Sequence, residues 1–171
     1  MSHPIVADAS PLIALARAGL LRLLRDLYGQ VLVPSAVHEE LEIARRRPGY
    51  ESLEEALAEG WLAPVAVQAV EGQERLGRLV GRGEREAILL ATRHACRFLL
   101  IDERSGRAAA EKQGIPVVGT GGVLLAAKQQ GLIPSVAAVL DQLAALRFRL
   151  SGELRHRLLE LAGEGPGGGC R

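Results

Sequence analysis

The sequence predicts an α/β protein, a three-layer α/β/α sandwich with a central parallel sheet. Two observations support this prediction. Short β-branched runs alternate with longer helical patterns along the chain, which is the rhythm of βαβ units. The runs are almost continuously apolar rather than alternating, which is typical of parallel strands that are covered on both faces.

The individual elements follow from this rhythm. Four runs are predicted as strands and a fifth is weaker: residues 5–7, 31–33, 98–101 and 116–119, and the weaker 64–67. Helical patterns occupy residues 11–26, 35–47, 52–59, 83–95, 104–113, 121–130, 135–147 and 152–162. Ser10 is predicted as the N-cap of the first helix, because Pro11 suits a first helical position.

Most of the chain is predicted to form one domain. A length of 171 residues is enough for a sizeable core. We expect this domain to cover residues 1–150, followed over 151–171 by a C-terminal helix and a disordered glycine-rich tail. Residues 68–83 are polar and interrupted by glycines, which predicts a mobile connector.

Composition excludes several classes of protein. Aromatic residues make up only 3% of the chain, which argues against surfaces that stack nucleic-acid bases. The net charge of +1 lacks the footprint of a duplex-DNA binder. Two distant cysteines imply no disulfide framework, and we find no secretion signal and no apolar run of roughly 18 residues that would span a membrane. A cytoplasmic protein with no membrane partner is therefore expected.

Acidic residues follow two of the predicted strands. Asp8 follows the run 5–7, and Asp102 and Glu103 follow the run 98–101. The carboxyl ends of parallel strands meet at one edge of a sheet, where ligands of open α/β sheets bind. We therefore expect these acids to face the same edge.

Two further acids lie on helices. In the helix over 35–47, Glu40 falls about 65° from the centre of the apolar stripe, at the edge of the buried face. Glu84 lies on the core-facing stripe of the helix over 83–95, where the helix N-terminus also favours negative charge. Taken alone, Glu84 is better explained as a first-turn residue that complements the helix dipole.

Four carboxylates at one edge would require protons or cations. Two like charges about 4 Å apart repel by roughly 4 kcal/mol at an effective dielectric near 20. An all-oxygen donor set suits Mg²⁺ or Mn²⁺ rather than Zn²⁺, and the histidines have no ligand spacing. Divalent ions in acidic pockets promote hydrolysis of phosphodiesters, which is the activity that we hypothesise.

These residues together resemble the PIN-domain family. The matching stretches are "IVADASPLIALARAGLLRLL", "VLVPSAVHEEL", "GEREAILLA" and "LLIDERSGRAAAEKQGIPVVGTGGVLLAAKQQGLI", which span most of residues 5–133 in the family's order. The last stretch looks most like small prokaryotic relatives of VapC-type toxins. The resemblance implies a Rossmann-like fold and a Mg²⁺- or Mn²⁺-dependent ribonuclease. It also implies RNA, a small antitoxin protein and a second copy of the chain as partners.

The resemblance also assigns roles to residues of this sequence. Catalytic and metal-binding acids are implied at Asp8, Glu40, Glu84 and Asp102, with Glu103 as a further metal ligand. Substrate contacts are implied at Ser10 and Thr120, which match small hydroxyl residues of the family. Arg104 and Arg107 lie one turn apart beside Asp102, where they would contact phosphate or serve as ordinary surface charge. The chain departs from the family in having Glu84 where many members have Asp, and from Ala138 onward it has no clear counterpart.

The alternatives to a ribonuclease are a dinucleotide-binding protein and a non-catalytic binding module. The stretch "VVGTGGVLLA" joins a strand to a helix through glycines, but it lacks the full dinucleotide-binding spacing, and too little chain follows it for a nucleotide-binding half. The stronger alternative to a ribonuclease is a non-catalytic binding module that keeps this fold and acts through protein or nucleic-acid partners.

Overall fold

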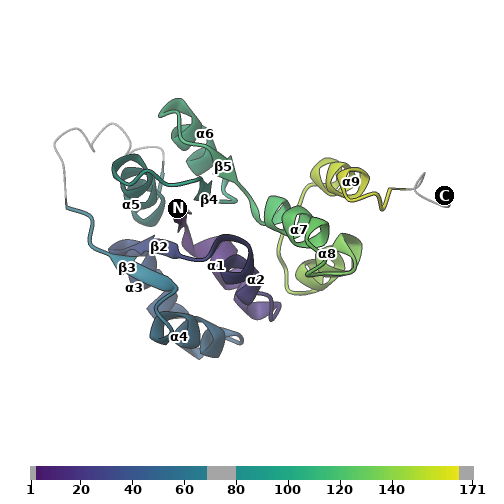
Figure 1. Cartoon of the computed structure of the whole chain (residues 1–171), viewed down its shortest axis with the longest axis horizontal. Helices are drawn as coiled ribbons and strands as arrows, with labels where there is room; N and C mark the ends of the chain where they lie inside the picture. The colour runs from purple at the N-terminus through teal and green to yellow at the C-terminus, as the bar shows by residue number, and fades with distance from the viewer. Residues whose placement is uncertain (1–2, 69–79, 166–171) are drawn as a thin grey trace. The chain divides into compact units, whose positions relative to one another are not determined.

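A computed structural model describes residues 3–68 and 80–165 (Figure 1). Its sheet has five parallel strands in the order β3-β2-β1-β4-β5. The strands are β1 (Ile5–Ala7), β2 (Val31–Pro34), β3 (Leu62–Val65), β4 (Leu99–Leu100) and β5 (Val117–Val118). The predicted α/β class with a parallel central sheet is therefore confirmed, and the weak fifth run is a strand that starts two residues earlier than expected.

The central strand β1 is buried on both faces. Val6 pairs with Leu32 on one side and with Leu99 on the other. It packs in a core cluster that includes Ile88 and Ala110. The neighbouring residues of β1 point to the opposite face and are also fully buried, which explains why the run has no polar alternation.

The helices occupy the segments between and after the strands. They are α1 (Ala9–Arg17), α2 (Arg22–Tyr28), α3 (Ser35–Ile43), α4 (Tyr50–Ala58), α5 (Arg82–Arg93), α6 (Arg104–Lys112), α7 (Thr120–Gln129), α8 (Val136–Ala145) and α9 (Gly152–Leu161), with a 3-10 turn η1 (Ala44–Arg46) after α3. Figure 1 shows α5 and α6 beside each other next to β4 and β5, and α4 next to β3. In the described ranges no helix combines the length and apolarity needed to cross a lipid bilayer.

The prediction of one helix over residues 11–26 was wrong. Two helices, α1 and α2, occupy this segment, and the chain turns between them at Gly19, whose φ of 70° suits glycine. The predicted N-cap at Ser10 was also wrong. Asp8 is the N-cap of α1, so the helix begins one residue after it, and Ser10 and Pro11 lie inside the first turn. The acid that ends β1 therefore also begins α1.

The chain divides into two compact units, Met1–Thr120 and Gly121–Arg171, and the division falls within α7. The first unit contains the sheet and α1 to α6. In the second unit α8 packs against α9. The expected domain boundary at residue 150 stays a prediction. The predicted connector falls largely on residues 69–79 and the predicted tail ends in 166–171, and both ranges lie outside the described residues.

Candidate active site

Asp8 is a buried acid at the carboxyl end of the central strand. It is 4% exposed, and its backbone N–H donates to Leu100 O of the neighbouring strand at 2.9 Å. Burial and repulsion by Glu84 and Glu40 raise the pKa of Asp8 to about 6, although the N–H groups at the start of α1 partly offset the rise. Asp8 thus lies within electrostatic reach of two other carboxylates from different helices.

Glu40 and Glu84 extend from α3 and α5, which pack against each other. Partial burial of its carboxyl end and repulsion by Glu84 raise the pKa of Glu40, while the charge of Arg82 lowers it. The Glu84 Oε2 atom accepts a hydrogen bond from the N–H of Gly81, the N-cap of α5, at 2.8 Å. The predicted first-turn role of Glu84 is therefore present, and Glu84 also acts electrostatically on Asp8 and Glu40.

Glycines provide the space that these side chains occupy. A Cβ atom on Gly83 would collide with the carboxyl group of Glu40. A Cβ atom on Gly106 would lie 2.7 Å from Glu84 Oε1. The backbones of α5 and α6 therefore lie directly against these carboxyl groups, which would have to shift if either glycine carried a side chain.

Asp102 lies beyond the end of β4, and its two carboxylate oxygens are both held by Thr120. The Thr120 N–H donates to Oδ1 at 2.7 Å, and the Thr120 hydroxyl donates to Oδ2 at 2.6 Å. Burial raises the pKa of Asp102, and the two hydrogen bonds from Thr120 and the charge of Arg107 partly offset this rise. A Cβ atom on Gly119 would lie 2.9 Å from Asp102 Oδ1, so this carboxylate also needs a glycine beside it.

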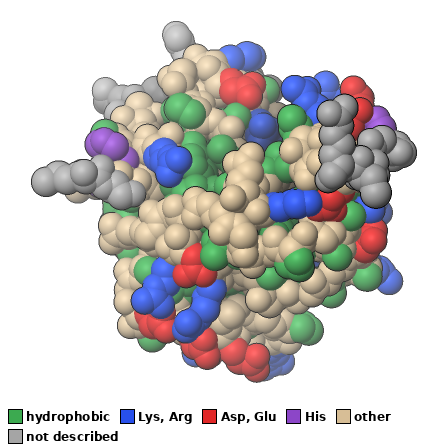
Figure 2. Space-filling view, turned by 45° about the vertical axis from the view of Figure 1, so that its right-hand side comes forward, with side chains coloured by type: hydrophobic (Ala, Val, Ile, Leu, Met, Phe, Trp, Pro, Cys, Tyr) green, Lys and Arg blue, Asp and Glu red, His purple; other side chains and the backbone are tan. Residues whose placement is uncertain are grey.

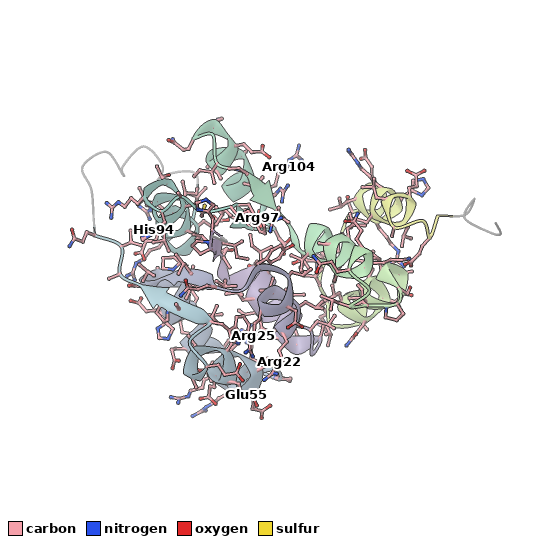
Figure 3. All side chains as sticks on the ribbon, in the orientation of Figure 1. Arg22, Arg25, Glu55, His94, Arg97 and Arg104 are labelled. Carbon is pink, nitrogen blue, oxygen red and sulfur yellow. The ribbon has the colours of Figure 1, made fainter. Side chains whose placement is uncertain are left out.

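The remaining predicted residues differ in their surroundings. Arg107 is half-buried, and its Nη1 donates to Ile101 O at 3.0 Å, next to Asp102. Arg104, the first residue of α6, is exposed (Figure 3), as are Glu103 and Ser10. The structure therefore brings Asp8, Glu40 and Glu84 into one electrostatic group and places Asp102, Thr120 and Arg107 together, whereas the roles given to the exposed residues stay predictions.

Two residues near the site were missed from the sequence. Glu86 was not among the predicted site residues, yet its Oε2 accepts a hydrogen bond from the Ala36 N–H of α3 at 2.8 Å. Arg82 was assigned to the connector, yet it begins α5 and binds Glu39 of α3 as well as Glu86. The only sequence signal was that α3 follows Pro34, which provides no side-chain cap, so its N–H groups need acceptors from elsewhere.

The donor set fits a divalent cation that prefers oxygen. Carboxylates are the protein ligands of Mg²⁺ and Mn²⁺, and the repulsion among Asp8, Glu40 and Glu84 would be relieved by a bound cation. In the part of the chain that the structure describes, no three His, Cys, Asp or Glu side chains stand close enough to share one ion. One ion bound by all three acids would therefore require their side chains to lie closer together.

The visible surface does not gather charge of one sign. In Figure 2, Lys and Arg side chains lie beside Asp and Glu side chains on the face that is shown. This mixture agrees with the net charge of +1.

Comparison with known proteins identifies the family of this chain. A family model described as a PIN domain matches residues 4–164, nearly the whole chain. The expectation that the chain has no family counterpart from Ala138 onward was therefore wrong as far as residue 164, because the match continues through this segment. No curated protein matches this sequence.

Proposed function

Because this chain belongs to the PIN-domain family, whose members are generally nucleases, we propose that it is a metal-dependent ribonuclease. It would hydrolyse phosphodiester bonds in single-stranded or structured RNA with Mg²⁺ or Mn²⁺. The burial of Asp8 is the observation that supports this proposal. Its carboxyl group is only 4% exposed, and the charges of Glu84 and Glu40 repel it. A buried carboxylate is costly unless it gains a partner, and a divalent ion is the partner that all three acids would share.

Each residue has a proposed role. Asp8, Glu40, Glu84 and Asp102 would hold the ion, with Glu103 at the margin of the site. A bound Mg²⁺ or Mn²⁺ would supply Lewis-acid activation and neutralise charge on the phosphate. Thr120 fixes the orientation of Asp102 through two hydrogen bonds. Contacts to RNA are proposed for Ser10, Arg104 and Arg107.

The test is cleavage of a labelled single-stranded RNA, and of a hairpin RNA, with and without Mn²⁺ or Mg²⁺. Wild type should cut only with the metal, and Asp8→Asn should reduce cutting by roughly a hundredfold, because it removes the negative charge and one carboxylate oxygen of a proposed metal ligand. Asp141→Asn is the matched control, since Asp141 is an exposed acid of α8 paired with Arg155 at 2.7 Å. Equal cutting by wild type and Asp8→Asn would contradict the assignment.

A finer proposal concerns the biological setting. The stretch that ends at residue 133 resembles VapC-type relatives. This resemblance supports the proposal that the chain is a toxin, that a small antitoxin neutralises it, and that it forms a homodimer. Induced expression of wild type should stop growth of a host cell, whereas Asp8→Asn should not. If metal-dependent cutting is absent with both RNAs, the non-catalytic binding module becomes the better explanation of the fold.

A further inference from the structure

The relative placement of two site acids depends on how two helices pack. Glu40 belongs to α3 and Glu84 to α5. The helices lie so close that a Cβ on Gly83 of α5 would collide with the Glu40 carboxyl group. Any movement of α3 relative to α5 therefore changes the separation of the two carboxylates.

Glu86 ties α5 to the start of α3. Its Oε2 accepts from the Ala36 N–H at 2.8 Å, and its side chain is 18% exposed. The N-cap of α3 is Pro34, which offers no side-chain acceptor, so Glu86 supplies one from another helix. A carboxylate at this end of a helix is also favoured by the helix dipole.

Arg82 adds a second tie across the same interface. Its Nη1 donates to Glu39 Oε2 of α3 at 2.8 Å, and its Nε donates to Glu86 Oε1 at 3.3 Å. One guanidinium thus joins a carboxylate of α3 to a carboxylate of α5. We call Arg82, Glu86, Glu39 and the Ala36 N–H the α3–α5 brace.

The brace flanks the site acids in the sequence. Arg82 lies two residues before Glu84 and Glu86 lies two residues after it, while Glu39 immediately precedes Glu40. We propose that Arg82 and Glu86 are positioning residues, which hold α3 against α5 so that Glu40 and Glu84 can bind one divalent ion. This inference rests on the proposed function, and it assigns neither residue a contact with the ion or with RNA.

The experiment measures Mn²⁺ binding to the metal-free full chain by calorimetry at pH 7. The variants are Glu86→Ala, Glu86→Gln and Arg82→Gln. Glu86→Ala and Glu86→Gln remove the same charge, but only glutamine keeps an oxygen that can accept from Ala36. We expect Glu86→Ala to weaken Mn²⁺ binding by about tenfold or more, and Glu86→Gln to recover most of that loss.

Arg82→Gln separates positioning from simple electrostatics. Arg82 is a cation near Glu40, so its removal should strengthen Mn²⁺ binding if only charge matters. The brace instead predicts weaker binding, by several-fold. Since Arg82 is exposed, this variant also remains informative if Glu86→Ala fails to fold.

Tyr50→Phe is the control for a general loss of support to α3. Tyr50 donates its hydroxyl to Glu42 Oε1 at 2.6 Å, which is a contact of α3 with α4 rather than with α5. This variant should bind Mn²⁺ like wild type. Thermal unfolding of every variant shows whether it is folded at the temperature of the titration.

The outcomes separate this inference from the proposed function. If Glu86→Ala binds Mn²⁺ as tightly as wild type, or if Arg82→Gln binds it more tightly, the positioning role of the brace is contradicted. The nuclease proposal is tested separately by the cleavage assay. An equal loss in Tyr50→Phe would also overturn it, because the effect would then be unspecific. If wild type binds no Mn²⁺, the result contradicts both the proposed metal site and the positioning role of the brace.

Discussion

At the residue scale, the charge on Asp8 is destabilising in the metal-free protein. The folded state raises the pKa of this carboxyl group from 3.8 to about 6, so between these values the folded state holds a proton that the unfolded state has released. The free energy of unfolding must therefore fall as pH rises from about 4 to about 6, and it stays reduced above that range. Under the proposed function, a bound divalent cation would offset this cost.

Asp8→Asn should consequently stabilise the metal-free protein. A shift of this size corresponds to roughly 3 kcal/mol at pH 7, since one pKa unit is worth about 1.4 kcal/mol. Urea unfolding with a chelator present, at pH 4 and at pH 7, measures the effect. The free energy of unfolding of the variant should exceed that of wild type at pH 7, and this difference should shrink toward pH 4. A variant less stable than wild type at pH 7 would show that Asp8 has a stabilising partner in the folded state.

Two glycines of the site have a role that the local sequence does not indicate. Gly83 and Gly106 each leave room for a glutamate from another helix, and neither has the positive φ that usually identifies an indispensable glycine. Gly83 could be read only as part of a helix start, and Gly106 only as a weak residue inside a helix. Their role depends on residues far away in the sequence, so no local pattern reveals it.

At the element scale, a strand end and a helix start are coupled through Asp102 and Thr120. Thr120 is fully buried at the start of α7, and its hydroxyl and N–H both donate to Asp102. These bonds lower the pKa of Asp102 against the effect of burial. They therefore favour the ionised form of Asp102, which is the form that its proposed role as a metal ligand requires.

Thr120→Val should remove one of these bonds and raise the pKa of Asp102 further. Less Asp102 is then ionised at a given pH, so the acidic limb of the activity profile should move to higher pH. The lost bond to a charged group should also cost roughly 1.5–3 kcal/mol of stability at pH 7. The pH dependence of RNA cleavage and urea unfolding measure the two effects. Thr120→Ser keeps the hydroxyl and should behave like wild type, and an unshifted acidic limb in Thr120→Val would contradict this role.

The helices and strands also show which parts of the fold could be predicted from the sequence alone. The five strands were predictable because buried parallel strands are apolar without alternation, and the edge that holds Asp8 and Asp102 followed from the direction of those strands. The break between α1 and α2 was missed because the apolar pattern continues through Gly19. Glu86 and Arg82 were missed because their partners lie on α3, and helical periodicity describes only the helix to which a residue belongs.

At the scale of the whole molecule, the second unit has its own polar anchor. Glu164, which follows α9, accepts hydrogen bonds from the N–H groups of Val136 and Ala137 at 2.8 Å each and from the Ser135 hydroxyl at 2.9 Å. Lys128 of α7 also binds this carboxylate. One side chain thus ties the end of α9 to α7 and to the start of α8, within a unit that has no sheet to organise it in its described residues.

Acid should release this anchor. Burial raises the pKa of Glu164, but Lys128, the two backbone N–H groups and Ser135 outweigh burial and lower it from 4.5 to about 2. The stabilisation is therefore fully present above pH 4.5 and is lost as pH falls through the folded pKa. In hydrogen exchange at pH 7, Glu164→Gln should lose protection in α8 and α9, whereas amides of β1 and β2 should exchange as in wild type.

The pH dependence distinguishes this anchor from ordinary surface charge. Because glutamine does not titrate, the difference in the free energy of unfolding between wild type and Glu164→Gln should decrease as pH falls from 4.5 toward 2. Glu160→Gln is the control, since Glu160 is exposed and pairs with His156, one helical turn away, at 3.3 Å. A constant difference across this pH range would mean that the shape of the glutamate, rather than its charge, holds the three helices together.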